Sequence, residues 1–430
     1  MSSGLTQGRQ MAKLNQDSGS IERDDCLALD AKDPLGHFRE YFDLPAGLIY
    51  CNGNSLGPLP RKAARIAQRV VSQEWKAGLT QSWNQAGWFH LPQTLGAKLA
   101  QLLGARKDEV VMTDGVSVNL FKLLHLALSL NPGRHVILMD GTAFPTDSYT
   151  AQGVVAALGL PYRVDFRTTE DLLDGLSDQV AVVCLSDIHY KTGRVSDMAA
   201  MTEAAHSVGA LTLWDLCHSA GVFPLALNAC GADLATGCTY KYLNGGPGSP
   251  GYVFVARRHQ NQSAQPLWGW WGHASPFAFD ATYTPAPGIQ QLLVGTQPIL
   301  SMAVAEAGID LALRAEMGLV RQKSCALGNL FIAQVQAQCR DTDFTLACPE
   351  EAAQRGSQVA FRHPRGYEII RALADLGVIG DFRAPDVVRF GLAPLFLRYA
   401  DVWDAAQQLL HVLDAGLWQK AEYRQRSAVT

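Results

Sequence analysis

The sequence has no excess of charge of one sign, no paired cysteine motif and no long apolar run. Its 430 residues carry 36 Lys and Arg against 40 Asp and Glu, a formal net charge of -4, which gives no general attraction to nucleic acid or acidic membranes. Nine cysteines form an odd number without a C-x-x-C pair, so a reducing cytoplasm is favoured over a disulfide framework. The first 20 residues contain no apolar segment that could serve as a signal core, and no later run approaches the roughly 20 apolar residues of a membrane span. We therefore predict a cytoplasmic protein with small-molecule partners and a loose tail over residues 1–20.

Metal-binding patterns are missing as well. The tightest spacing of His and Cys is the adjacent pair Cys217 and His218, and neighbouring residues rarely chelate one ion. The sequence therefore predicts no metal site.

Alternating short and long apolar segments are typical of an α/β protein. Apolar residues make up 48% of the chain and charged residues 18%, enough for a full-sized core. From about Leu48 to Arg257, β-rich runs alternate with amphipathic stretches such as 117-SVNLFKLLHLALSL and 197-DMAAMTEAAHSVG. The β-rich runs are 135-HVILMD, 180-VAVVCLSD, 210-ALTLWDL and 251-GYVFVAR. This alternation predicts a mostly parallel sheet covered by helices.

The pattern changes after about Gln291. Two long helical regions, 298-PILSMAVAEAGIDLALRAEMG and 319-LVRQKSCALGNLFIAQVQAQ, precede strand-like 387-VVRFGLAP and a closing helix, 402-VWDAAQQLLHVLDAGLWQKA. We predict a large α/β domain over residues 21–297, including the N-terminal segment, and a smaller C-terminal α+β domain over residues 298–430.

The sequence context of one lysine is unusual. In 234-LATGCTYKYLNGGPGSPG, Lys241 lies between two tyrosines, after an apolar segment and before a glycine-rich turn. Partial desolvation lowers the proton affinity of a lysine, and a neutral amine can attack an aldehyde to form a Schiff base. A lysine snorkelling from a strand end is the simpler reading of this segment taken alone.

A carboxylate and a helix start supply the context that favours a cofactor. Asp215 ends the buried run 211-LTLWD, three residues before His218, at the edge where parallel sheets bind ligands. A carboxylate there can keep a pyridinium nitrogen protonated, and a lysine Schiff base with an acidic pyridinium partner is the signature of pyridoxal 5'-phosphate. The segment 115-GVSVNLFKLL offers a helix N-terminus with Gly115 and Ser117 for the phosphate. Each feature alone has a structural explanation, as a helix cap or a satisfied core residue.

Two motif matches favour other chemistries. The segment 246-GPGSPG fits G-x-G-x-x-G but runs into strand-like 252-YVFVA, so we interpret it as a chance match to a dinucleotide fingerprint. The segment 53-GNSLG fits G-x-S-x-G, which would make Ser55 the nucleophile of a serine hydrolase with Asp215 and His218 as partners. Pro58 and Pro60 argue against a tight strand-to-helix elbow, but a serine hydrolase remains an alternative.

With Lys241, Asp215 and an aromatic loop in place, the chain resembles the kynureninase family. These are fold type I pyridoxal-phosphate enzymes that cleave kynurenine to anthranilate and alanine in tryptophan catabolism. The matching segments, in order, are 53-GNSLGPLP, 144-FPTD, 214-WDLCHSAG, 237-GCTYKYLNGGPG, 268-WGWWGH, 295-GTQPIL and 377-GVIGDFRAPDVVRFGLAPL. They run through most of the chain, and their common order argues against chance.

The resemblance implies a role for each matching position. Lys241 would form the Schiff base, Asp215 would contact the pyridine nitrogen, and Tyr240 would be the acid that protonates the alanine fragment. The remaining cofactor-binding positions would be Val116, Ser117, Phe144, Pro145, Thr146, Asp147, Ser186, His218, Tyr240, Trp270 and Thr296. On the substrate side, Arg389 would hold the α-carboxylate, a task suited to a guanidinium fork, with Ser55, Trp83, Gly295 and Thr296.

The resemblance also implies a homodimer, in which Trp270 and Thr296 reach the cofactor of the neighbouring subunit. The chain departs from the family's common residues at Val116–Ser117, Asn52 and Cys217, and none of these changes removes a reacting group. Gly295 and Thr296 resemble bacterial members, which favour kynurenine over its 3-hydroxy form. Alternatives of the same fold are a desulfurase or an aminotransferase, although no cysteine-bearing mobile loop is evident, and a degenerate binding protein.

Overall fold

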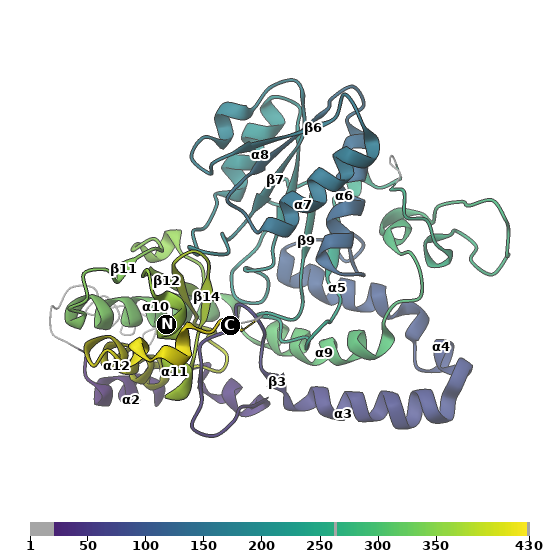
Figure 1. Ribbon diagram of the computed structural model, residues 1–430. Coiled ribbons are helices and arrows are strands. Elements are labelled where there is room, and N and C mark those ends of the chain that lie inside the picture. Colours follow the sequence, from purple (N-terminus) through teal and green to yellow (C-terminus); the bar gives the residue numbers. More distant parts are fainter. Residues whose placement is uncertain (1–20, 262–264, 428–430) are drawn as a thin grey trace, which may run out of the picture.

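A seven-stranded sheet forms the centre of the large domain in the computed structural model, which describes residues 21–261 and 265–427 (Figure 1). The strand order is β4-β10-β9-β8-β7-β5-β6, and β10 alone runs antiparallel to its neighbours. The strands are β4 (Val110–Met112), β5 (Val136–Asp140), β6 (Arg163–Arg167), β7 (Val180–Ser186), β8 (Leu211–Asp215), β9 (Leu234–Gly237) and β10 (Tyr252–Val255). The predicted parallel-rich α/β architecture is confirmed.

Helices cover both faces of this sheet, which explains why inner strands such as β7 and β10 are apolar on both faces, whereas the edge strand β6 is polar and partly exposed. On one face lie α6 (Val116–Leu130) and α7 (Pro145–Leu158). On the other lie α5 (Leu91–Leu103), α8 (Met198–Ser207) and α9 (Ile299–Arg314). Successive residues of one strand alternate between the two cores, as Val111 and Met112 do. Asp197 caps α8 by accepting a hydrogen bond from the Ala200 amide, as a helix starting at an acidic residue should.

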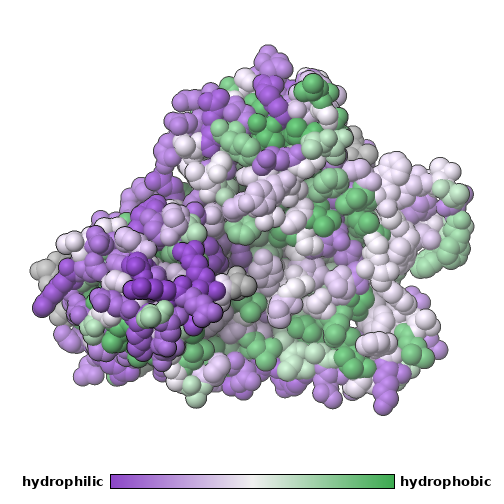
Figure 2. Space-filling view, in the orientation of Figure 1, coloured by the Kyte–Doolittle hydropathy of each residue, from purple (hydrophilic) through white to green (hydrophobic). Residues whose placement is uncertain are grey.

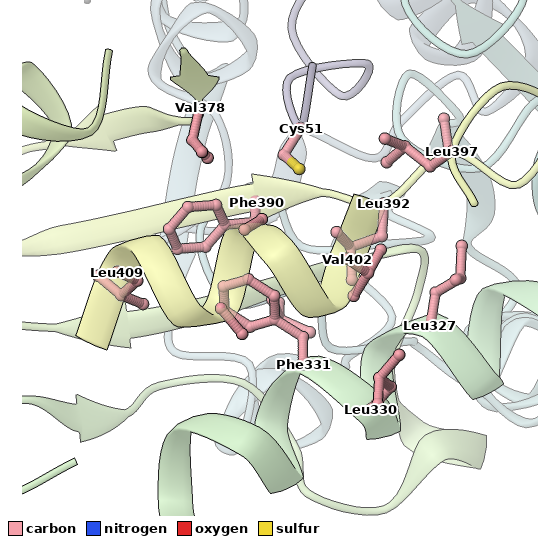
Figure 3. Close-up of a cluster of buried hydrophobic side chains, with 14 of the residues drawn as sticks. Cys51, Leu327, Leu330, Phe331, Val378, Phe390, Leu392, Leu397, Val402 and Leu409 are labelled. Atoms are coloured by element: carbon pink, nitrogen blue, oxygen red, sulfur yellow. The ribbon is translucent and has the colours of Figure 1, made fainter. Parts of the chain in front are cut away.

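The small domain packs three helices against a four-stranded antiparallel sheet of order β11-β12-β15-β14. Its strands are β11 (Thr345–Leu346), β12 (Gln358–Arg362), β14 (Asp381–Arg383) and β15 (Val387–Gly391). Its helices are α10 (Met317–Gln338), α11 (Gly366–Asp375) and α12 (Tyr399–Asp414). Phe331 of α10 and Phe390 of β15 lie 4.7 Å apart between ring centroids, and Leu409 of α12 packs in the same core (Figure 3).

The packing departs from the predicted domain boundaries at two places. The N-terminal segment packs on the small domain: α2 (Arg23–Asp30) lies against α12, and β2 (Ile49–Tyr50) pairs with β13 (Val378–Ile379). Conversely α9, which the boundary at residue 298 assigned to the small domain, packs against α5 and against α3 (Arg61–Arg69) of the large domain. Apolar periodicity shows that a helix has a buried face but not which partner covers it.

The remaining elements connect the two domains. Strands β1 (Phe42–Asp43) and β3 (Leu59–Pro60) form a two-stranded sheet before α3. A π-helical stretch, Val70–Gly78, leads from α3 to the short helix α4 (Ser82–Gln85). Within residues 21–261 and 265–427, no helix is long and apolar enough to cross a membrane.

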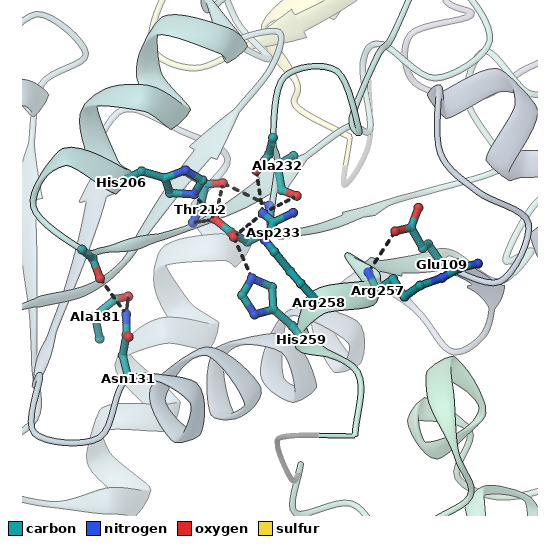
Figure 4. Close-up of polar contacts among 12 residues, drawn as sticks. Glu109, Asn131, Ala181, His206, Thr212, Ala232, Asp233, Arg257, Arg258 and His259 are labelled. Atoms are coloured by element: carbon teal, nitrogen blue, oxygen red, sulfur yellow. Dashed lines mark hydrogen bonds and ion pairs between the residues drawn. The ribbon is translucent and has the colours of Figure 1, made fainter.

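A buried carboxylate joins several segments at the amino-terminal side of β8 and β9. Asp233 accepts hydrogen bonds from the Thr212 amide, Arg258, His206 and His259 at 2.6–2.8 Å (Figure 4). Burial alone would raise the pKa of Asp233, but the hydrogen bonds from the two histidines, the amide and the arginine outweigh it and hold the pKa below its ordinary range.

The two domains differ in surface character. In the space-filling view the small-domain half is mostly hydrophilic, whereas apolar residues are exposed over much of the large-domain half (Figure 2). Exposed large apolar side chains of the large domain include Trp268, Phe277, Phe279 and Leu300. Apolar patches of this kind commonly mark an interaction surface.

Candidate active site

A cavity of about 440 Å³ opens at the carboxyl edge of the large sheet. The parallel strands bring their ends to this edge, so residues that follow different strands meet there. Asp215 is the last residue of β8, Lys241 follows β9, and Phe144 follows β5. The small domain closes the cavity with Arg383 and Arg389. The predicted residues that line it are Ser55, Val116, Ser117, Phe144, Thr146, Asp147, Asp215, His218, Tyr240, Lys241 and Arg389.

Within the described residues, the amine of Lys241 makes its one polar contact with His218. Nζ of Lys241 lies 3.0 Å from Nε2 of His218. Burial, and then the charge of Lys241, lower the pKa of His218 well below its usual value, so the imidazole is neutral at physiological pH. A neutral ring that accepts from Lys241 at Nε2 carries its proton on Nδ1, which is buried without a partner in the described residues. This nitrogen is available to a bound molecule.

Two carboxyl groups share one side of the cavity. Asp215 accepts a hydrogen bond of 2.8 Å from the Cys217 amide. Burial, and then the negative charge of Asp215, raise the pKa of Asp147, which hydrogen-bonds to Asp215. The raised pKa favours the protonated form of Asp147, which can donate to Asp215. One carboxylate supported in this way suits a protonated heteroaromatic nitrogen.

Tyr240 and two buried thiols lie beside the lysine. The Tyr240 ring centroid is 6.0 Å from Nζ of Lys241. The neighbouring Cys238 sulfur, and then burial, raise the pKa of Tyr240, so its hydroxyl keeps a proton that it can donate. Cys238 contacts the carbonyl of Cys217 at 3.7 Å; both thiols are buried, and Cys217 lines the cavity.

The start of α6 lies open to the cavity. Gly115 is the N-cap residue, and a Cβ atom built there would have no neighbour within 4 Å. The first-turn amides of Val116 and Ser117 lack partners within the helix, and the helix dipole favours an anion at this end. Glycine, the exposed amides and the Ser117 hydroxyl together form a cradle for a phosphate group.

Two arginines of the small domain share one buried carboxylate. Arg389 donates to both oxygens of Asp381, from Nε at 2.7 Å and Nη2 at 2.6 Å, and its Nη1 donates to the Tyr190 carbonyl. Arg383 contacts the same carboxylate at 2.8 Å. Because one negative charge faces two positive charges, this wall keeps a net positive charge that can attract a substrate carboxylate.

Six predicted site residues do not line the cavity within the described chain. Pro145 faces the neighbouring hollow beside Tyr190, and Ser186 pairs with Asp215 in the sheet register. Trp83 and Trp270 lie 6.2 Å apart in a separate aromatic cluster, and the amide of the adjacent Trp271 donates to the Val294 carbonyl. Gly295 and Thr296 follow this carbonyl directly.

Several cavity residues were missed by sequence reasoning. These are Asn54, Tyr190, Cys217, Gly248, Ser249 and Arg383. Arg383 lies six residues before Arg389 in the matched segment, so its place on the adjacent strand β14 was the available signal. Tyr190 follows an isolated bridge after β7, and no local pattern indicates that this loop turns into the cavity.

The serine hydrolase alternative is not supported by the geometry. Ser55 lies in a turn between two short strands, and His218 directs Nε2 to Lys241 while its Nδ1 has no partner in the described chain. The glycines of 53-GNSLG have another explanation. A Cβ atom at Gly57 would come within 2.4 Å of the Lys241 carbonyl, so glycine lets this turn pack against the lysine loop.

Among the residues that the structure describes, one group of possible metal ligands lies outside the cavity, in the small domain. It consists of Asp341, Asp343 and His363. Nδ1 of His363 accepts a hydrogen bond from the Arg365 amide, which leaves Nε2 to donate to Asp341 at 3.2 Å. The absence of a metal site stays a prediction.

Comparison with known proteins agrees with this geometry. Residues 49–239 match the family description "Aminotransferase class I and II", and residues 320–409 match "Kynureninase C-terminal domain". A kynureninase of Burkholderia mallei (strain SAVP1) is 49% identical over 413 residues, which cover 95% of this chain and 99% of that protein. A kynureninase of Pseudomonas fluorescens is 48% identical over the same shares of both chains.

Solved structures show the same fold at low sequence identity. The cysteine desulfurase of Thermococcus onnurineus NA1 has a TM-score of 0.74 at 15% identity and covers 88% of this chain and 98% of its own. The cystine C-S lyase C-DES, in complex with cysteine persulfide, has a TM-score of 0.71 at 18% identity and covers 87% and 98%.

Fold and site together define a fold type I enzyme that depends on pyridoxal 5'-phosphate. The cavity offers what this cofactor requires, which is an amine, a carboxylate for the ring nitrogen and an open helix N-terminus for the phosphate, and it adds an unpartnered imidazole nitrogen. Within this class, near-full-length identity of 48–49% shows that the chain belongs to the kynureninase family.

Proposed function

We propose that this protein hydrolyses the Cβ–Cγ bond of L-kynurenine to give anthranilate and L-alanine, and that it also accepts 3-hydroxykynurenine to give 3-hydroxyanthranilate. Membership of the kynureninase family supports the reaction. The observation that supports this reaction most directly is that Lys241 and Asp215 line the same cavity as Arg383 and Arg389. The reaction belongs to tryptophan catabolism and to the kynurenine route of NAD biosynthesis.

The residues that would hold the cofactor come from five segments. Lys241 would bind it covalently through its amine, Asp215 would pair with its ring nitrogen, and the α6 cradle of Val116 and Ser117 would take its phosphate. Phe144, with Pro145, Thr146 and Asp147, would flank its ring, and Ser186 and His218 would complete the site. When bound, the cofactor supplies an electron sink for negative charge on the substrate's α and β carbons.

The chain's own groups bind the substrate and move its protons. The Lys241 amine, when it is not bound to the cofactor, would take the Cα proton of the substrate. Neutral His218 accepts a hydrogen bond from that amine without competing for positive charge. Tyr240, whose phenol stays protonated, donates the proton that completes alanine. Arg389 binds the α-carboxylate, and Ser55 contacts the substrate from the N-terminal segment.

We also propose that two copies of the chain complete each site. Trp83, Trp270, Gly295 and Thr296 lie together outside the cavity of their own subunit, next to the exposed apolar side chains of Phe277 and Phe279. A surface of this composition suits a second copy. Trp270 and Thr296 would then reach the partner's cofactor. The reducing cytoplasm favoured by nine free cysteines is the proposed location.

Replacement of Lys241 tests the proposed chemistry. The Lys241→Ala variant should lose the visible absorption of the covalently bound cofactor and should not release anthranilate or alanine from kynurenine. Lys191→Ala, which changes a lysine of the neighbouring hollow, is the matched control and should keep both properties. Turnover by Lys241→Ala would contradict the assignment, and alanine formed from cysteine rather than from kynurenine by the unchanged enzyme would favour a desulfurase.

A further inference from the structure

A completely buried lysine lies two turns into α6. Lys122 is 0% exposed, and its Nζ contacts Oδ2 of Asp114 at 2.7 Å and the Leu292 carbonyl at 2.8 Å. Burial lowers the pKa of Lys122, and the charge of Asp114 opposes this change. Removing an ammonium from water costs several kcal/mol, and an apolar side chain of similar length would avoid that cost. The contacts of Lys122 must therefore explain its presence.

The first contact fixes the residue that precedes the phosphate cradle. Asp114 has φ of 41°, in the left-handed region that non-glycine residues seldom adopt. Its carbonyl accepts from the Gly251 amide at 2.7 Å, and its carboxylate also accepts from the Thr113 hydroxyl at 2.9 Å. Lys122 thus reaches back from α6 to hold the side chain of the residue immediately before the N-cap Gly115.

The second contact joins the cradle to the segment 292–297. The Leu292 carbonyl accepts directly from Lys122. At the other end of this segment, the Gln297 side chain accepts from the Asp114 amide at 3.4 Å and donates to the Gly295 carbonyl at 3.3 Å. Lys122 and Asp114 therefore link the start of α6 to the segment that carries Gly295 and Thr296.

We propose that Lys122 is a positioning residue for recognition of the cofactor phosphate. Through Asp114 it sets the direction of the first turn of α6, so that the amides of Val116 and Ser117 and the Ser117 hydroxyl converge on one anion. Lys122 does not line the cavity, so it acts through the backbone. This inference rests on the proposed placement of the phosphate at α6.

Two ligands that differ only in the phosphate test this role. Lys122→Met keeps the length and apolar body of the side chain but removes the ammonium. Titrated into the apoenzyme, pyridoxal 5'-phosphate should bind this variant about tenfold more weakly, the expected effect of weakening one hydrogen bond to a charged group. Pyridoxal, which lacks the phosphate, should bind the variant and the unchanged enzyme equally. Equal weakening for both ligands would overturn the proposal, because general loss of structure does not discriminate between them.

A second buried lysine provides a matched control. Lys323 of α10 contacts Asp33 at 2.7 Å and the Pro394 carbonyl at 2.7 Å in the small domain. Lys323→Met should reduce stability but leave unchanged the affinity ratio, which is the affinity for pyridoxal 5'-phosphate divided by that for pyridoxal. An affinity ratio lowered as much as in Lys122→Met would overturn the proposal. If Lys122→Met fails to fold, Asp114→Asn weakens the same ion pair at a partly exposed side chain and should also lower the affinity ratio. An unchanged affinity ratio in Asp114→Asn would overturn the proposal.

Ser117→Ala separates the two levels of inference. If the affinity ratio falls in Ser117→Ala but does not change in Lys122→Met, the role of Lys122 is refuted and the proposed phosphate cradle stands. No change in either variant would refute the phosphate placement itself, and with it the role of Lys122.

Discussion

Asp187 is a buried carboxyl group whose replacement should stabilise the protein. It follows Ser186 at the end of β7, is 2% exposed, and its Oδ2 has no hydrogen-bond partner in the described chain. Burial raises the pKa of Asp187 from 3.8 to about 7, a hydrogen bond from Ser219 opposes the change, and the negative charge of Asp215 adds to it. The folded protein therefore holds this proton more tightly than the unfolded chain does.

The size of the effect follows from the two pKa values of Asp187. The folded state binds more protons between 3.8 and about 7, so the stability of the protein falls as pH rises through this window. Each pH unit corresponds to about 1.4 kcal/mol, so the carboxyl group lowers the free energy of unfolding by about 4 kcal/mol above the window. Asp187→Asn has nearly the same shape and cannot ionise. It should be more stable than the unchanged protein by about 4 kcal/mol at pH 8 and by about 2 kcal/mol at pH 5.

Urea unfolding of the holoenzyme at these two pH values, followed by tryptophan fluorescence, measures the difference. Asp178→Asn, which alters an exposed carboxylate, is the control and should show no gain that depends on pH. A stabilisation by Asp187→Asn of equal size at both pH values would refute the ionisation argument. A variant less stable than the unchanged protein at pH 8 would show that the carboxylate has a partner of opposite charge.

Two further replacements test other parts of the structure. Arg389→Lys keeps the charge but loses the fork that binds Asp381. The KM for kynurenine should therefore rise about tenfold or more, as for loss of a charge-assisted hydrogen bond, while the visible absorption of the cofactor stays unchanged. A normal KM in steady-state assays would show that Arg389 does not bind the substrate carboxylate. Asp233→Asn takes the carboxylate from Arg258, His206 and His259 and should lower the free energy of unfolding by about 3–5 kcal/mol at pH 7. Because the pKa of Asp233 is depressed in the folded state, that difference should shrink as pH falls below the ordinary aspartate value, and a constant difference in unfolding titrations would contradict the assignment.

The sequence predicted the sheet and the cavity centre because both depend on local patterns. Apolar runs such as 180-VAVVCLS gave β7, and the carboxyl ends of parallel strands bring Asp215 and the lysine loop to one edge. The side on which α9 packs could not be predicted, because its apolar face fits either domain. The interaction of Arg389 with Asp381 was missed for a similar reason. The two residues are cross-strand neighbours on β14 and β15, and strand register is set by tertiary packing.

Resemblance to a family located residues that no local pattern indicates, such as Trp83 and Thr296. It did not show how the chain supports them. The hydrogen bonds from Lys122 to Asp114 and to Leu292 link sequence positions as much as 170 residues apart, and nothing in the run 117-SVNLFKLL distinguishes this lysine from a surface one.

The cavity takes its amine and its arginines from different domains. The amine and acid groups stand on the large sheet, whereas Arg383 and Arg389 stand on β14 and β15 of the small one. A small rotation of one domain against the other would change the distance between these arginines and the amine, and it would also disturb the hydrogen bond from Arg389 to the Tyr190 carbonyl. The distance between the positive wall and the amine therefore depends on how the C-terminal third of the chain packs against the large sheet.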